Sequence, residues 1–87
     1  MQKANVEIYT WEHCPYCNKV IQLFEKKRIK YTCYRIDGDE SAREKMAERA
    51  NGKRTVPQVF IDNKHIGGCD DTHELDKKGE LDKLIFE

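Results

Sequence analysis

Two cysteines, Cys14 and Cys17, stand three positions apart in the segment His-Cys-Pro-Tyr-Cys-Asn, which covers residues 13 to 18. A Cys-x-x-Cys pair of this kind is either a redox couple or one half of a metal site. A redox pair needs one thiol that ionises readily, whereas a zinc site needs two further thiolate or imidazole ligands. The elements that position the pair therefore determine which chemistry is open to it.

The residues around this pair predict a strand that leads into a helix. Residues 6 to 10 alternate apolar and polar side chains, which is typical of a short strand, and a three-residue loop follows. Pro15 suits the first position of a helix, because its missing N–H group would have had no partner there. The helix should end near Lys27. Its apolar face, at spacing i, i+3, i+4 and i+7, consists of Cys17, Val20, Ile21 and Phe24.

This placement makes the two thiols unequal. Cys14 lies at the N-terminal edge of the helix, where free backbone N–H groups and the positive end of the helix dipole favour a thiolate. Cys17 lies one turn further on, on the apolar face, and should be less exposed and less ionised. We expect Cys14 to attack a substrate disulfide and form a mixed disulfide, which Cys17 or an outside thiol then resolves.

The middle of the chain predicts a second strand and a second helix. Residues 31 to 36 are rich in aromatic and β-branched side chains, which favours a strand, and residues 37 to 39 form a turn. Residues 41 to 44, Ser-Ala-Arg-Glu, match a capping box, so we expect a helix from there through about Ala50. The first two strands and the helix between them form a βαβ unit, whose strands run parallel with a right-handed crossover.

The C-terminal third predicts a hairpin followed by more helix. Residues 58 to 61 form a strand, residues 62 and 63 a two-residue turn, and residues 64 to 66 the partner strand. A last helical region follows and is divided at Gly79. The predicted fold class is α/β, with a mixed four-stranded sheet flanked by helices.

Composition limits the classes of partner. The chain of 87 residues is enough for one small domain, which we place over residues 1–87. Its 16 Lys and Arg balance its 16 Asp and Glu, whereas a nucleic-acid-binding domain is usually basic. The sequence shows no apolar signal segment and no stretch long enough to cross a bilayer. We therefore expect a cytoplasmic protein without nucleic acid or membrane partners, in which a close cysteine pair is more often catalytic or metal-binding than structural.

Zinc is the serious alternative to redox chemistry. Cys69 and His73 could join Cys14 and Cys17 in a Cys₃His site of plausible spacing. The first pair, however, opens a long amphipathic helix instead of lying in a zinc-knuckle turn. Tyr16, between the cysteines, also lacks the turn freedom that glycine gives such knuckles. These features favour the redox couple and leave a zinc-binding structural module as the alternative.

Three motifs occur in order along the chain: Cys-Pro-Tyr-Cys at residues 14–17, Thr-Val-Pro at 55–57 and Gly-Gly-Cys-Asp-Asp at 67–71. In this order and at these intervals they resemble the glutaredoxins, in particular the small bacterial dithiol class, over nearly the whole chain. The resemblance implies a thioredoxin-like fold, glutathione as reductant and co-substrate, and no metal. It also implies that Pro57 follows a cis peptide bond and faces the active site.

The resemblance further implies how glutathione would bind. The main chain of Val56 would pair with the cysteinyl part of the extended tripeptide. Asp70 and the N–H groups near Cys69, at a helix start, would hold the γ-glutamyl end. The glutathione-binding residues implied in this way are Tyr16, Lys53, Arg54, Thr55, Val56, Pro57, Gly68, Cys69, Asp70 and Asp71.

One position departs from the family pattern. Many glutaredoxins carry a lysine three residues before the first cysteine, where it helps to hold a glutathione carboxylate and steadies the thiolate. This chain has Trp11 there. We expect Lys53 or Arg54, which precede the Thr-Val-Pro motif, to supply the missing charge to the glycyl carboxylate. Trp11 itself would either stack on a substrate or cover the loop with apolar surface.

The resemblance also implies partners and leaves two alternatives. The partners are glutathione, glutathionylated proteins and disulfide-bonded proteins such as ribonucleotide reductase, with the chain acting as a monomer. One alternative is a redoxin reduced by thioredoxin reductase, although thioredoxin typically has Cys-Gly-Pro-Cys and a longer chain. The other is a glutathione-ligated iron–sulfur dimer, but Pro15 and Tyr16 resemble the redox members more than the cluster carriers.

The remaining cysteines and histidines are expected to serve structure more than chemistry, although a charged His13 beside Cys14 is an alternative that would lower the pKa of that thiol. Cys33 lies in a predicted strand and is expected to be buried and inert. Cys69 lies beside the implied groove, where a thiol retained for packing is expected and oxidation or glutathionylation is the alternative. The three histidines, His13, His65 and His73, are expected at the surface.

Overall fold

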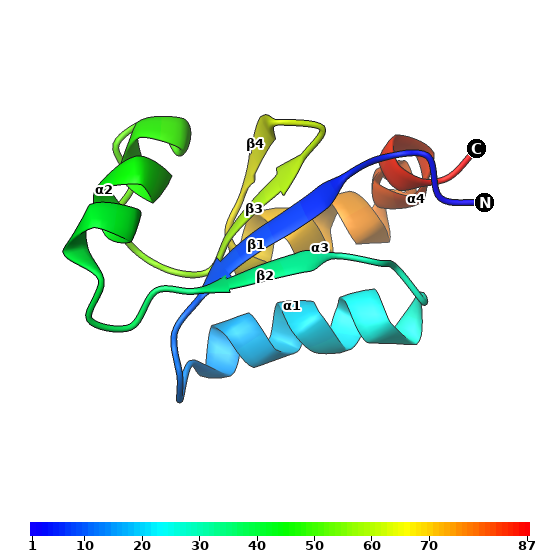
Figure 1. Cartoon of the computed structure of the whole chain (residues 1–87). Coiled ribbons are helices and arrows are strands. Elements are labelled where there is room, and N and C mark those ends of the chain that lie inside the picture. Colours follow the sequence, from blue (N-terminus) through cyan, green and yellow to red (C-terminus); the bar gives the residue numbers. More distant parts are fainter.

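A computed structural model describes all of residues 1–87 and contains one four-stranded sheet with helices on both faces (Figure 1). The order of elements agrees with the prediction, with the last helical region split in two. In chain order the elements are β1 (Val6–Thr10), α1 (Pro15–Lys26), β2 (Thr32–Arg35), α2 (Glu40–Arg49), β3 (Gln58–Ile61), β4 (Lys64–Gly67), α3 (Cys69–Lys77) and α4 (Glu80–Ile85).

The sheet is mixed, as predicted, with strand order β2-β1-β3-β4. β1 runs parallel to β2, with Ile8 opposite Cys33, and antiparallel to β3, with Ile8 opposite Val59. β3 and β4 form the predicted hairpin. Asp62 and Asn63 make its turn with φ angles of 50° and 67°, which suits the tolerance of these residue types for the left-handed region.

Each face of the sheet has its own apolar core. On one face β1 and β3 pack against α1 and α4, and on the other face they pack against α2. Figure 1 shows α1 lying along β2, with α2 well apart from it. The first core contains Ala4, Val6, Ile8, Val20, Phe24, Ile29, Val59, Ile61, Leu81 and Ile85, and the second contains Tyr9, Ile36, Met46, Ala50 and Phe60.

Every residue of β1 is buried, which differs from the half-exposed strand that its alternating sequence predicts. The reason is that α2 covers the second face and supplies a partner for the polar side chains. Glu7, only 7% exposed, accepts hydrogen bonds from Arg49 on α2 and from the hydroxyl of Tyr34 on β2. The alternating pattern therefore predicted the strand correctly, but the exposure that it predicts for the polar side chains is wrong.

The predicted capping box at residues 41–44 is wrong. α2 begins at Glu40, and its cap is the side chain of Asp39, whose Oδ1 accepts the N–H of Ala42 at 3.0 Å. Asp39 follows Gly38, whose φ of 69° completes the turn. Because aspartate is as good an N-cap as serine, the earlier residue forms the cap once the turn delivers it in extended conformation.

Cys33 is exposed, so the expectation of a buried thiol is wrong. The reason is topological: β2 is an edge strand, and all four of its residues are exposed. The Cys33 Sγ atom lies 3.3 Å from the Oγ1 atom of Thr10 on the adjacent strand.

The C-terminal region ends beside the N-terminus. Gly79, with a φ of 74°, separates α3 from α4, as predicted. Gln2 and Phe86 then form an isolated bridge, which brings the two chain ends together (Figure 1). No helix in the structure is both long enough and apolar enough to span a membrane.

Candidate active site

The cysteine pair lies at the N-terminus of α1. Cys14 is the N-cap residue, and its Sγ atom accepts the backbone N–H of Cys17 at 3.2 Å. Their Cα atoms are 5.2 Å apart, and the two sulfurs form a disulfide. Cys17 is only 1% exposed, whereas Cys14 is half-buried. The thiols are therefore as unequal as the helix periodicity predicts, with Cys14 the more accessible and closer to the positive end of the helix dipole.

The loop before Cys14 is anchored to the carboxyl ends of β1 and β2. The backbone N–H of Glu12 donates to Asp37 at 2.7 Å, and the guanidinium of Arg35 donates to the same carboxylate at 3.1 Å. The hydrogen bond from Glu12 is the main reason why the pKa of Asp37 is lowered, and Arg35 adds to it. His13 lies at the tip with its side chain 90% exposed, as expected.

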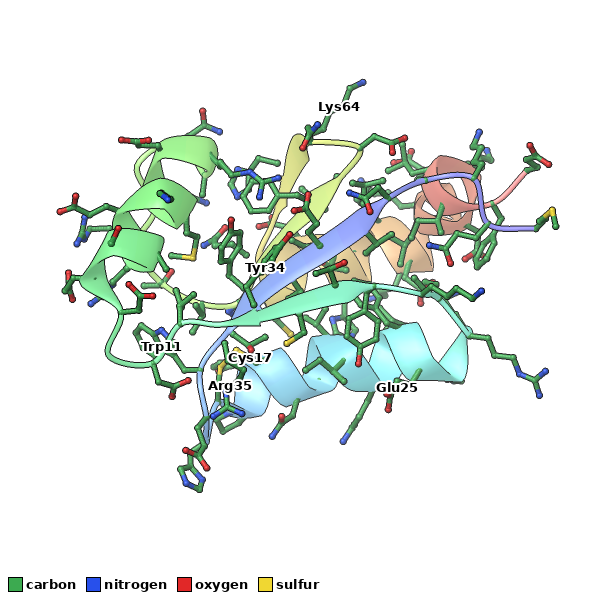
Figure 2. The ribbon with its side chains drawn as sticks, in the orientation of Figure 1. Trp11, Cys17, Glu25, Tyr34, Arg35 and Lys64 are labelled. Carbon is green, nitrogen blue, oxygen red and sulfur yellow. A yellow bond between two sulfur atoms is a disulfide. The ribbon has the colours of Figure 1, made fainter.

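Trp11 packs as apolar cover at the end of the sheet from which α1 starts. Its ring packs against the core beneath α2, and the Arg43 guanidinium lies 5.1 Å from the ring centroid. Figure 2 shows Trp11, Cys17 and Arg35 at the end of the sheet from which α1 starts, and all three line one shallow hollow there. Of the two roles expected for Trp11, the structure favours apolar cover.

The segment before β3 presents free main chain. The peptide bond between Val56 and Pro57 is cis, as the family resemblance implies. The two carbonyl groups that precede Val56 are occupied: that of Arg54 accepts from Arg43 at 2.9 Å, and that of Thr55 accepts from the Gln58 side chain at 3.0 Å. By contrast, neither the N–H nor the C=O of Val56 has a partner among the hydrogen bonds of the structure. Val56 can therefore pair with an added extended chain.

The start of α3 lies against this segment because two glycines permit a close approach. A Cβ atom on Gly68 would lie 3.2 Å from the Pro57 carbonyl oxygen. Gly67 has a φ of 124°, and a Cβ there would collide with the Asp71 carboxylate, which accepts the N–H of Gly68. The first turn of α3 also presents N–H groups, at Cys69 and neighbouring positions, that have no acceptor within the helix.

These segments line an open cavity of about 250 Å³ beside the cysteine pair. Nine of the ten residues that the resemblance implies for glutathione line it. The tenth, Arg54, lies outside, and its guanidinium faces Glu40 at 3.3 Å. One lining residue, Gln58, was missed, because a glutamine at the start of a strand carries no signal of its own. The lining consists of Tyr16, Lys53, Thr55, Val56, Pro57, Gln58, Gly68, Cys69, Asp70 and Asp71.

Charges around the cavity perturb one thiol. Burial, reinforced by the Asp70 carboxylate, raises the pKa of Cys69, and Lys19 on α1 opposes the shift. Lys19 also lies over the ring of Tyr16, 5.2 Å from its centroid. Cys69 therefore remains a neutral thiol at ordinary pH, in agreement with the expectation of a packing role.

The zinc alternative requires four ligands to converge, and they do not. Cys69 and His73 are neighbours, with Sγ and Nδ1 3.5 Å apart. Cys14 and Cys17, however, are bonded to each other, and no group of three or more metal-binding side chains occurs in the structure. His73 instead hydrogen-bonds the Cys69 carbonyl at 2.9 Å.

His65 is half-buried, so its expected surface position is only partly right. Its Nε2 atom lies 2.6 Å from Oε1 of Gln58, and its Nδ1 atom lies 3.3 Å from the Asn51 amide. Burial lowers the pKa of His65, and the positive charge of Lys53 lowers it further, against an opposing effect of Asp71. The histidine is therefore neutral near pH 7.

Comparison with known families agrees with this geometry. The family profile named Glutaredoxin matches residues 6–66, which include the cysteine pair and the cis-proline segment. The chain belongs to the glutaredoxin family. A probable glutaredoxin of Synechocystis is 55% identical over 82 residues, covering 94% of this chain and 93% of the relative. Glutaredoxin 3 of Escherichia coli is 51% identical over 82 residues, covering 94% of this chain and 98% of the relative.

Solved structures show the same fold. Wheat glutaredoxin superposes with a TM-score of 0.85 at 38% identity, over 95% of this chain and 79% of that one. A buckwheat glutaredoxin–glutathione complex superposes with a TM-score of 0.86 at 30% identity, over 94% of this chain and 76% of that one. The predicted thioredoxin-like fold is thus confirmed. Glutaredoxins are glutathione-dependent thiol–disulfide oxidoreductases, and this chain is an enzyme of that class, with Cys14 and Cys17 as its dithiol pair.

Proposed function

We propose that Cys14 is the nucleophile and Cys17 the resolving thiol. The observation that carries this assignment is the position of Cys14 at the helix N-cap, where its sulfur accepts an N–H and is the more accessible of the two. These features stabilise a thiolate, which is the attacking species. Cys17 is buried on the apolar face but lies within bonding reach of Cys14, which is what a resolving thiol needs.

Two reaction routes follow from this division. With a glutathionylated protein, the Cys14 thiolate attacks the glutathione sulfur, and the protein thiolate leaves and takes up a proton. A second glutathione thiolate then attacks the sulfur of the bound glutathione, which releases oxidised glutathione and restores Cys14. With a protein disulfide, Cys14 forms a mixed disulfide with the protein. Cys17 then attacks the Cys14 sulfur, which releases the reduced protein, and two glutathiones reduce the resulting Cys14–Cys17 disulfide.

The cavity beside the pair is the proposed glutathione site. The unpaired N–H and C=O of Val56 would form a short antiparallel ladder with the cysteinyl residue of glutathione. The free N–H groups at the start of α3, with Asp70 beside them, would hold the charged γ-glutamyl end. Tyr16, two residues after Cys14, also lines this cavity. Glutathione is the extended tripeptide that such a combination of free main chain and charge fits.

Lys53 is the proposed partner of the glycyl carboxylate. It lines the cavity, whereas Arg54 pairs with Glu40 on the other side of the segment. Lys53 would therefore supply the charge that other family members carry at the position of Trp11.

The proposed substrates are glutathionylated proteins and disulfide-bonded proteins such as ribonucleotide reductase. The proposed setting is the cytoplasm, with the chain acting as a monomer formed by one domain over residues 1–87. The chemistry of the pair supports the substrates, because a half-buried nucleophile with a buried resolving partner serves both one-thiol and two-thiol exchange.

The decisive experiment measures NADPH oxidation by the protein with glutathione, glutathione reductase and a small glutathionylated disulfide. Parallel reactions replace the glutathione system with thioredoxin reductase. Turnover that requires glutathione and saturates with it is the expected result. Turnover only with thioredoxin reductase would keep the redox pair and overturn the glutathione site, and no turnover in either would overturn the proposed function.

A further inference from the structure

Gln58 is a buried polar residue in the wall of the cavity, and the reaction scheme above gives it no role. It is the first residue of β3, is only 2% exposed, and shares its face of the strand with Phe60. Its side chain turns back toward the preceding segment, where Nε2 lies 3.0 Å from the Thr55 carbonyl oxygen. Its Oε1 atom lies 2.6 Å from Nε2 of His65 on β4. Both polar ends of the amide are therefore engaged.

The direction of these hydrogen bonds is fixed by the carbonyl group at one end. The Thr55 carbonyl can only accept, so the Gln58 amide must present its NH₂ group there and its oxygen toward His65. His65 must then carry its proton on Nε2 and accept the Asn51 amide at Nδ1, which requires the neutral ring. The low pKa of His65 agrees with that form. Three side chains thus orient the Thr55 carbonyl group through one chain of hydrogen bonds. They are Asn51 after the C-terminal end of α2, His65 on β4 and Gln58 on β3.

That carbonyl group controls the direction of a functional N–H. The C=O of Thr55 and the N–H of Val56 belong to the same planar peptide unit, and in this trans unit they point in opposite directions. When Gln58 holds the oxygen on the protein side, the Val56 N–H must point away from it. That N–H is one of the two unpaired main-chain groups at the cavity.

We propose that Gln58, oriented by His65, is a positioning residue that holds the Thr55–Val56 peptide unit so that the Val56 N–H meets the cysteinyl part of glutathione. This inference rests on the proposed glutathione site. It assigns Gln58 no contact with the reacting sulfurs. The residue contributes to binding of glutathione and not to the nucleophilicity of Cys14.

The test compares Gln58→Met, which keeps length and removes both polar ends, with Gln22→Met on the exposed face of α1 as the matched control. Two quantities are measured: the KM for glutathione in the coupled assay, and the rate at which iodoacetamide alkylates reduced Cys14. We expect Gln58→Met to raise the KM about three- to tenfold, the effect of one hydrogen bond, with kcat and the alkylation rate changed by less than about twofold. Gln22→Met should change none of these.

A second pair of variants keeps the inference testable if Gln58→Met fails to fold. His65→Phe removes the donor that orients the amide, and it should raise the KM in the same direction but by less. In the double variant the two effects should not add, because both act through one chain of hydrogen bonds. Urea unfolding establishes that each variant is folded under assay conditions.

Two results would overturn the inference. One is an unchanged KM in folded Gln58→Met or His65→Phe. The other is an equal loss in kcat and in alkylation rate, which would mean that Gln58 serves general packing. A wild-type protein that fails to saturate with glutathione is a different result, since it overturns the proposed function before any variant is compared.

Discussion

The Arg49 guanidinium on α2 donates to both carboxylate oxygens of Glu7 on the buried central strand β1, at 2.8 Å and 3.3 Å. The same guanidinium lies 4.1 Å from the centroid of the Phe60 ring and donates to the Tyr9 hydroxyl at 2.9 Å. One side chain thereby attaches α2 to two strands of the sheet. Because α2 also contacts the segment before β3 through Arg43, this attachment supports one wall of the proposed glutathione site.

Removing this guanidinium should weaken the fold strongly. Arg49→Leu leaves the Glu7 carboxylate buried without its cation, and the loss of one partner of a buried ion pair costs about 3 kcal/mol. We expect the free energy of unfolding, measured in urea, to fall by about that amount. Lys45→Met, on the exposed face of the same helix, should change it by less than about 0.5 kcal/mol. Equal losses in both variants would contradict the ion-pair argument.

Acid should weaken the same contact. The hydrogen bond from Arg49 is the largest cause that lowers the pKa of Glu7 below its usual 4.5 in the folded chain. A carboxyl group with a lowered folded pKa contributes stability above its unfolded pKa, and this contribution is lost as the pH falls through the folded pKa. The difference in unfolding free energy between the wild type and Glu7→Gln should therefore be full at pH 7 and shrink below about pH 4.5. A difference that stays constant from pH 7 to pH 3 would mean that Glu7 does not titrate in this way.

Most of the sheet was predictable because local patterns and topology agree. The β3–β4 hairpin was identified by the two-residue turn Asp62-Asn63 between two short strands, and the crossover through α1 fixed the parallel pair β1–β2. Errors arose where the outcome depends on what lies above a strand. Glu7 is buried because α2 covers its face, and Cys33 is exposed because nothing covers the edge strand β2. Neither the burial of Glu7 nor the exposure of Cys33 can be predicted from the residues of the strand itself.

The residues of the candidate site were likewise predictable only where local sequence patterns identify them. Cys14 was found because the type and spacing of the cysteine pair carry chemistry, and Val56 was found because the Thr-Val-Pro motif resembles that of the glutaredoxins. Gln58 was missed because its contribution depends on a partner, His65, that reaches it only through the hairpin pairing. Arg54 was expected beside Lys53, but its guanidinium faces Glu40 on α2 instead of the cavity, because an acidic partner on that helix lies within reach.

Replacing Cys14 and replacing Cys17 should have different effects on the two kinds of disulfide substrate. Cys14→Ser should reduce turnover of every disulfide substrate to background, because no attacking thiolate remains. Cys17→Ser should retain turnover of a small glutathionylated disulfide, since that route needs one thiol, and should lose reduction of a protein disulfide. The coupled NADPH assay with each substrate checks both statements. Loss of both activities in Cys17→Ser would contradict the division of labour.

Lys53 and Arg54 should differ although they are neighbours. Lys53→Ala removes the only basic side chain that lines the cavity, so the KM for glutathione should rise about two- to fivefold, the range of a partly exposed ion pair. The effect should diminish at high salt, because exposed charges are screened. Arg54→Ala breaks a contact with Glu40 outside the cavity and should leave the KM nearly unchanged. A larger rise in Arg54→Ala than in Lys53→Ala would assign the carboxylate to the other residue.

Gly67 should be the least replaceable glycine of the chain. Gly67→Ala would place a Cβ against the Asp71 carboxylate at a φ of 124°, so both the backbone and the neighbouring side chain resist it. We expect the free energy of unfolding to fall by about 2 kcal/mol or more. The KM for glutathione should also rise, because Asp71 must release the N–H of Gly68 and thereby displace the start of α3.

Gly38→Ala is the matched control for this substitution. Gly38 also has a positive φ, 69°, but nothing lies within 4 Å of the position that its Cβ would take. Its replacement should cost about 1 kcal/mol of left-handed backbone strain and leave the KM for glutathione unchanged. Both variants carry a positive φ, but the backbone penalty is larger at Gly67, because a φ of 124° lies outside the left-handed region that other residues can enter. A rise in the KM that occurs in Gly67→Ala and not in Gly38→Ala therefore measures the close packing at the start of α3 beside the proposed glutathione site. If both variants lost the same stability and kept the same KM, that packing would have no part in holding the site.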